Sequence, residues 1–411
     1  MTRSERGPVS RPALSRCIRV SAEEFADRNW GREPLLSTAD DLAAGFDDLF
    51  SADAVDELVT RRGVRTPFIR MAQEGSVLAA SAYTASGGFG AEVADQVSSD
   101  QVFAEFAGGA TIVLQGLHRL WPPIIDFTRA LIDDLGHPAQ VNAYVTPPSS
   151  QGFDPHYDTH DVFVLQISGE KHWRIHAPVH VDPLRSQPWE QHRGAVARAA
   201  TQDPVIDAVL RPGDALYLPR GWIHSATALG ATSVHLTVGM SAYTRADIVD
   251  ALLGQVGDSA DLRASLPLGL DLRDPEALAP IVEQTVRALI EALQQTDAAR
   301  PAAILSRRFE ADTRPEPVPP LATLEALATL GADSPVRWRG SLAVRIATAG
   351  DRVRIVARTK TLSLPAEAEQ AVRRLATGDP TTARELPGLD PESAVVVVRR
   401  LVREGFLVVA A

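Results

Sequence analysis

The feature that most constrains the fold is a dense series of strand-like segments between residues 139 and 240. These segments are rich in β-branched and aromatic residues and comprise residues 139–145, 161–167, 171–177, 215–218 and 231–240. Residues 168–170 predict a short hairpin loop, and residues 211–214 predict a tight turn. Many short strands joined by such turns indicate a sandwich or a closed β-barrel.

A helical pattern flanks this region on both sides. Residues 117–136 predict a helix that ends at Gly136. Residues 244–308 place apolar side chains at i, i+3, i+4 and i+7, which predicts amphipathic helices, and a proline-rich linker follows at 314–320. After the linker the sequence predicts a helix, a strand hairpin, further helices and a closing strand. That order suggests a winged-helix-like module.

Length and composition set outer limits on the kind of protein. At 411 residues the chain is long enough for two or three domains. We find no signal-peptide pattern and no run of about 18 apolar residues. The single cysteine, Cys17, cannot form an internal disulfide. These features predict a cytoplasmic protein.

The net charge of −11 is unevenly distributed along the chain. Residues 335–411 hold 13 Lys and Arg against 8 Asp and Glu, a net charge of +5, whereas the first 334 residues hold 28 against 44, a net charge of −16. An acidic body favours a basic partner and makes nucleic acid an unlikely ligand. The charge could equally serve only to keep the protein soluble.

Two motifs contain residues that could bind a metal. His156 and Asp158 lie two residues apart, so on a strand both side chains would point to the same face. This pair is weak evidence alone, because ten histidines and 52 acidic residues in 411 positions give about one such pair by chance. The second motif is more specific: Gly213, Pro219, Gly221 and His224 have the spacing of the second cupin motif.

Together these motifs supply two histidines and one carboxylate. That set is the facial triad that holds non-haem Fe(II) and leaves positions open for other ligands. Neutral imidazoles and one carboxylate leave net positive charge on the iron, which favours an anionic co-substrate.

The region around these motifs closely resembles the JmjC-type ribosomal oxygenases. The resemblance is carried by residues 142–158, which include the His156-Tyr-Asp158 motif, and by Val164–Arg174, and it extends back to Trp30 and forward through the helical region. These enzymes are 2-oxoglutarate-dependent hydroxylases of arginine or histidine side chains in ribosomal proteins.

The resemblance implies an α+β fold in three parts. These are a double-stranded β-helix (cupin/JmjC barrel) at 1–243, a helical dimerisation region with a linker at 244–320, and a winged-helix-like domain at 321–411. It also implies a homodimer that acts on a basic ribosomal protein with Fe(II), 2-oxoglutarate and O₂.

Residue by residue, the resemblance places iron on His156, Asp158 and His224. Lys171, fifteen positions after the first ligand, would bind the far carboxylate of 2-oxoglutarate, a strong charge-assisted pair in a barrel interior. Lys171 could instead be a solvated lysine at the edge of a hairpin. Asn142 and Tyr144 share one face of the preceding strand and Thr237 lies on the last strand, so these side chains would contact the co-substrate or support a ligand. Tyr144 and Thr237 could instead be ordinary polar residues of the barrel interior that satisfy each other.

His235 would also face inward, beside Thr237 on the last strand. A fourth protein ligand would close a position that the chemistry needs open. We therefore expect His235 to be packed and hydrogen-bonded within the protein.

Three other functions stay open at this point. The first is hydroxylation of a small molecule or a biosynthetic peptide by the same iron site. The second is a metal-binding cupin of different chemistry, such as a sugar-phosphate isomerase, although Asp158 and Lys171 argue against it. The third is DNA binding by the C-terminal module, where four consecutive valines beside Arg399 and Arg400 indicate a buried helix instead.

Overall fold

The computed structural model describes residues 11–73, 75–90, 92–148, 150 and 154–410. The chain divides into two compact units, Met1–Ala242 and Tyr243–Ala411. The proposed division of the second unit into two domains stays a prediction. In the part of the chain that the structure describes, none of the helices combines the length and apolar character needed to cross a bilayer.

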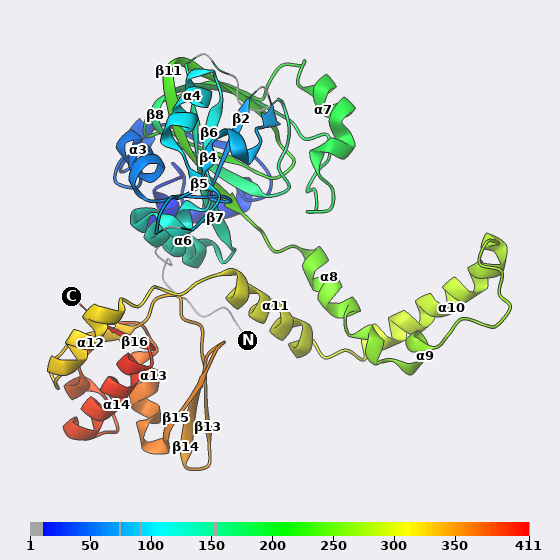
Figure 1. The fold of residues 1–411 in the computed structure, drawn as a ribbon. Coiled ribbons are helices and arrows are strands. Elements are labelled where there is room, and N and C mark those ends of the chain that lie inside the picture. Colours follow the sequence, from blue (N-terminus) through cyan, green and yellow to red (C-terminus); the bar gives the residue numbers. More distant parts are fainter. Residues whose placement is uncertain (1–10, 74, 91, 149, 151–153, 411) are drawn as a thin grey trace. The chain divides into compact units, whose positions relative to one another are not determined.

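An antiparallel nine-stranded sheet organises the first unit, with the order β1-β10-β8-β11-β7-β6-β2-β3 and with β9 beside β8. Its strands are β1 (Leu35–Ser37), β2 (Ile69–Gln73), β3 (Ser76–Val77), β6 (Thr111–Leu114), β7 (Ala139–Thr146), β8 (Asp161–His176), β9 (Ile206–Leu210), β10 (Ala215–Leu218) and β11 (Ile223–Met240). The sheet wraps around a common interior (Figure 1). This arrangement is the cupin-type fold expected from the sequence.

Helices and a small two-stranded sheet surround these strands. The elements are α1 (Pro12–Ser15), α2 (Ala22–Glu24), α3 (Ala52–Arg61), β4 (Thr84–Ala85), β5 (Gln96–Val97), α4 (Ser99–Ala107), α5 (Leu117–Leu120), α6 (Pro122–Leu135) and α7 (Arg193–Ala199). Gly136 ends α6 in the left-handed conformation, as predicted, and its N–H donates to the carbonyl of Ile132 at 2.8 Å. α6 buries Phe127 and Leu131 in the main core.

The predicted hairpin loop at residues 168–170 is wrong. β8 continues through it as one strand and pairs with β11 on both sides of the loop position. Gly169 has φ +65°, and a Cβ there would overlap the carbonyl oxygen of Thr232 on β11. The glycine is therefore needed for the close approach of two strands at an irregularity in their register.

The second unit has its own helices and strands. They are α8 (Arg245–Leu253), α9 (Ala260–Arg263), α10 (Pro275–Gln294), α11 (Ala299–Asp312), α12 (Pro320–Thr329), β12 (Val336–Trp338), β13 (Arg345–Ala349), β14 (Arg352–Val356), β15 (Thr361–Pro365), α13 (Glu369–Leu375), α14 (Pro391–Arg403) and β16 (Leu407–Val409). A separate core lies between α13, α14 and the C-terminal strands and includes Val353, Val398 and Phe406. The likeness of this part to a winged helix stays a prediction.

Candidate metal centre

The structure brings His156, Asp158 and His224 together. One potential ligand atom from each lies within 4.8 Å of the other two. His224 is the second residue of β11, whereas the other two lie in a loop. His156 forms a single antiparallel bridge with His224 and lies outside the regular strands, so the strand geometry assumed for His156 and Asp158 is not present. The side chains nevertheless alternate, because Tyr157 is buried and donates its hydroxyl to the Gln187 carbonyl at 3.0 Å.

Backbone contacts set the tautomers of both histidines. Nδ1 of His156 lies 2.7 Å from the carbonyl oxygen of Asp154, and Nδ1 of His224 lies 3.0 Å from that of Trp222. A carbonyl oxygen only accepts, so each Nδ1 carries the proton and each neutral ring keeps Nε2 as its basic nitrogen. Nε2 of His224 lies 3.8 Å from Oδ2 of Asp158. This is the orientation that a divalent metal between them requires.

The protonation states of this cluster also suit a metal. Burial, and next the neighbouring His156, lower the pKa of His224 to about 4, so its ring is neutral at pH 7. Burial alone would raise the pKa of Asp158, but His160, His224 and His156 together hold this pKa below its usual value. At pH 7 the cluster therefore offers His224 as a neutral imidazole and Asp158 as a carboxylate, and both donors fit Fe(II).

The three side chains line a cavity of about 340 Å³, and Lys171 lines the same cavity. Lys171 is only 3% solvent-exposed and donates to Oγ1 of Thr146 at 3.0 Å. Its ammonium lies 5.9 Å from the centre of the Trp173 ring. Burial lowers the pKa of Lys171 to about 7, because no carboxylate of the described chain offsets the loss of solvent. The solvated lysine at a hairpin edge is thus excluded.

Of the other residues that the sequence suggested as contacts of the co-substrate, two line the cavity and one does not. Tyr144 and Thr237 line the cavity, but Asn142 is not among the described residues that do so. The Oδ1 of Asn142 accepts a hydrogen bond from the N–H of Gly116 at 3.0 Å, at the start of α5. The geometry therefore gives no support to Asn142 as a contact of the co-substrate.

His235 also lines the cavity and is 3% exposed. Its ring stacks on Tyr144 with 5.1 Å between centroids and meets Trp173 edge-on at 5.5 Å. Within the described part of the chain, its Nδ1 has no hydrogen-bond partner. The expectation of a packed histidine is correct, but the expected hydrogen bond is missing at Nδ1.

Sequence reasoning missed several residues that line this cavity. Thr146 and Trp173 belong to β7 and β8, and Arg70 comes from β2. Trp189 and Glu190 line it from the short helix η4 (Trp189–His192), where the ring centroid of Trp189 lies 6.2 Å from that of His156.

Comparison with known proteins agrees with this geometry. Residues 119–248 match the family model described as JmjC domain. Over 139 residues, the chain is 43% identical to the bifunctional lysine-specific demethylase and histidyl-hydroxylase NO66 of Drosophila persimilis, covering 32% of this chain and 19% of that protein. Over 346 residues, it is 28% identical to human ribosomal oxygenase 1, covering 79% of this chain and 50% of that protein.

The chain contains a JmjC domain and is similar to ribosomal oxygenases. It spans between 14% and 60% of the length of eight curated relatives. Among solved structures, YcfD, a ribosomal oxygenase from Escherichia coli in complex with cobalt and succinic acid, aligns with a TM-score of 0.53. The alignment covers 96% of this chain and 99% of YcfD at 18% identity, and it therefore shows that the two chains share a fold.

Proposed function

We propose that this JmjC protein is a 2-oxoglutarate- and Fe(II)-dependent oxygenase that hydroxylates an arginine or histidine side chain of a ribosomal protein. The observation that carries the proposal is the meeting of His156, Asp158 and His224 with a buried lysine in one cavity. When bound, Fe(II) and 2-oxoglutarate together activate O₂ for insertion of oxygen into a C–H bond.

The cavity suits a small dicarboxylate. The ammonium of Lys171 and the hydroxyl of Thr146 lie side by side, where both can bind one carboxylate of the ligand. Nε1 of Trp173 and Nδ1 of His235 are buried and have no hydrogen-bond partner among the described residues. Buried polar atoms are rarely left without a partner, so these atoms favour a polar ligand in the cavity.

In this proposal the protein positions the metal and the co-substrate and sets the protonation of the metal ligands. His156 and His224 present Nε2 to the metal, and Asp158 adds the one negative charge. Lys171 anchors the far carboxylate of 2-oxoglutarate, so that its other end reaches the metal. The stacked rings of Tyr144 and His235 line the cavity and limit where the co-substrate can lie.

The charge of the chain and its similarity to ribosomal oxygenases support a basic protein as the substrate. The first 334 residues carry a net charge of −16, which attracts a basic chain. The relatives of the chain include proteins named "Ribosomal oxygenase 1" and "Bifunctional lysine-specific demethylase and histidyl-hydroxylase NO66". Glu190 at the cavity lining adds a carboxylate that a cationic side chain would meet on entry.

The test uses ribosomal proteins from cells that lack this gene. Incubation with the purified protein, Fe(II), 2-oxoglutarate and O₂ should add the mass of one oxygen atom to one arginine or histidine, which peptide mass spectrometry locates. Turnover of 2-oxoglutarate with a small molecule or a biosynthetic peptide, and no modified ribosomal protein, would instead support the alternative substrate class. Absence of any turnover would refute the oxygenase.

We also propose a homodimer formed through the helical region. Val282, Val286 and Ile290 form a stripe along α10 and are 56%, 47% and 51% exposed. Light scattering should give twice the 44.1 kDa of one chain at micromolar concentration. Val286→Asp should shift the protein towards monomer, whereas Gln284→Asp, which adds the same charge off the stripe, should leave the mass unchanged. A wild-type monomer would contradict the proposal.

DNA binding by the C-terminal module is the weaker candidate. Val397 and Val398 of α14 are buried in the core of that unit, so much of the helix is used for packing. A cytoplasmic location stays a prediction.

A further inference from the structure

A tight corner between β10 and β11 connects the metal ligands. The N–H of Gly221 donates to the carbonyl of Asp158 at 2.9 Å, and the carbonyl of Trp222 accepts from Nδ1 of His224 at 3.0 Å. Gly221 has φ +86°, and a Cβ there would lie 2.7 Å from the carbonyl oxygen of His180. The position of this corner therefore affects both Asp158 and the ring of His224.

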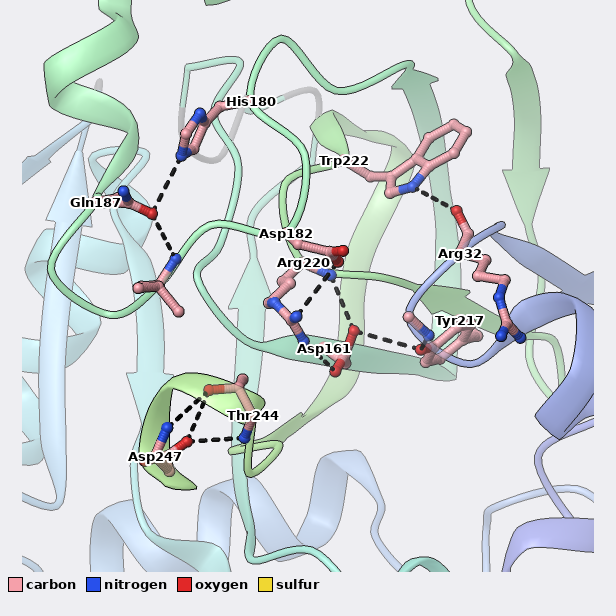
Figure 2. Close-up of polar contacts among 12 residues, drawn as sticks. Arg32, Asp161, His180, Asp182, Gln187, Tyr217, Arg220, Trp222, Thr244 and Asp247 are labelled. Carbon is pink, nitrogen blue, oxygen red and sulfur yellow. Dashed lines mark hydrogen bonds and ion pairs between the residues drawn. The ribbon is translucent and has the colours of Figure 1, made fainter. Parts of the chain in front are cut away.

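The corner is held by a segment that lies 190 residues earlier in the chain. Nε1 of Trp222 donates to the carbonyl of Arg32 at 3.1 Å (Figure 2). The neighbouring N–H of Gly31 donates to the hydroxyl of Tyr217 on β10 at 2.9 Å. Two hydrogen bonds thus connect residues 31–32 to the strand and the corner that precede His224.

A buried carboxylate completes this network. Asp161 is fully buried, and its Oδ1 accepts from the N–H of Arg220 at 3.0 Å and from the hydroxyl of Tyr217 at 3.4 Å (Figure 2). The guanidinium of Arg220 lies 3.8 Å from Asp161 and 3.3 Å from Asp182. The hydroxyl of Tyr217 therefore joins the N-terminal segment to the carboxylate that holds the corner.

We propose that residues 31–32, Tyr217 and Trp222 form a brace that positions His224 for metal binding, with Trp222 as its main positioning residue. The inference rests on the proposed function, because the metal belongs to that function. The carbonyl of Trp222 orients the imidazole, and the indole bond to Arg32 fixes that carbonyl. Partners of this kind typically change metal affinity by 10–100-fold although they never touch the metal.

Trp222→Phe tests the brace, because it keeps an aromatic ring and removes only the N–H. Co(II) serves as the probe, since its visible absorption bands report coordination geometry. The variant should bind Co(II) about tenfold more weakly and show altered bands. Trp338→Phe is the matched control, because Nε1 of Trp338 donates to the carbonyl of Leu342 at 3.3 Å in the second unit. It should leave Co(II) binding unchanged.

The Co(II) measurements distinguish a failure of the proposed brace from a failure of the proposed metal site. Equal losses of thermal stability in both variants, with the Co(II) affinity and spectrum of Trp222→Phe unchanged, would overturn the brace alone. Failure of the wild type to bind Co(II) would overturn the proposed metal site and the brace with it. Tyr217→Phe removes the other connection to the N-terminal segment and should change the spectrum in the same direction. This variant keeps the test decisive if Trp222→Phe does not fold.

Discussion

Replacing His224 with alanine is expected to abolish 2-oxoglutarate turnover and to weaken Co(II) or Fe(II) binding by more than about 100-fold, since loss of a ligand should exceed the loss of an outer partner. The fold should persist, because the barrel core around Phe163, Leu165 and Tyr217 is buried independently of the metal. Metal titration, succinate formation and thermal unfolding of the same preparation would measure all three effects.

His172→Ala is the matched control for this variant. His172 lies on β8 and interacts with Asp207 on β9, and it is not among the described residues that line the cavity. It should keep both metal binding and turnover. Full succinate production by His224→Ala would show that His156, Asp158 and His224 are not the metal site.

The metal ligands were predictable because their signal is local. The spacing of His156 and Asp158, and that of Gly213 and His224, is fixed by a loop and a corner whose geometry needs those residue types. His156 and Asp158 lie outside the regular strands, yet their side chains still point to the same side, as expected from the sequence. A loop with a single bridge to His224 places alternate side chains as a strand does.

The rest of the cavity was only partly predictable. Thr146 continues the alternation of Tyr144, and Trp173 continues that of Lys171, so a period of two along β7 and β8 could have found both. Arg70 gives no such signal, because it reaches the cavity from β2, far earlier in the chain. Asn142 has the right period but contacts Gly116 instead, which only the packing of α5 against β7 reveals.

The second large effect concerns Lys171. Lys171→Met should weaken 2-oxoglutarate binding by about 30- to 1000-fold, or about 2–4 kcal/mol, because it leaves a carboxylate in the cavity without its charged partner. Methionine fills most of the space of the lysine stem, so Co(II) binding should remain close to that of the wild type. Lys360→Ala removes the other lysine of the chain and should change neither quantity. An unchanged affinity for 2-oxoglutarate in Lys171→Met would exclude Lys171 from the co-substrate site.

The same lysine should make co-substrate binding depend on pH. Burial lowers the pKa of Lys171 to about 7 in the protein alone, so above pH 7 the amine is increasingly neutral. A bound carboxylate favours the charged form and raises this pKa, so binding above pH 7 must take up a proton. Affinity should then fall by up to about tenfold per pH unit above 7 and level off below it. Calorimetry at pH 8 in buffers of different ionisation enthalpy should detect proton uptake by the wild type and none by Lys171→Met, whereas equal uptake by both proteins would assign the proton to another group.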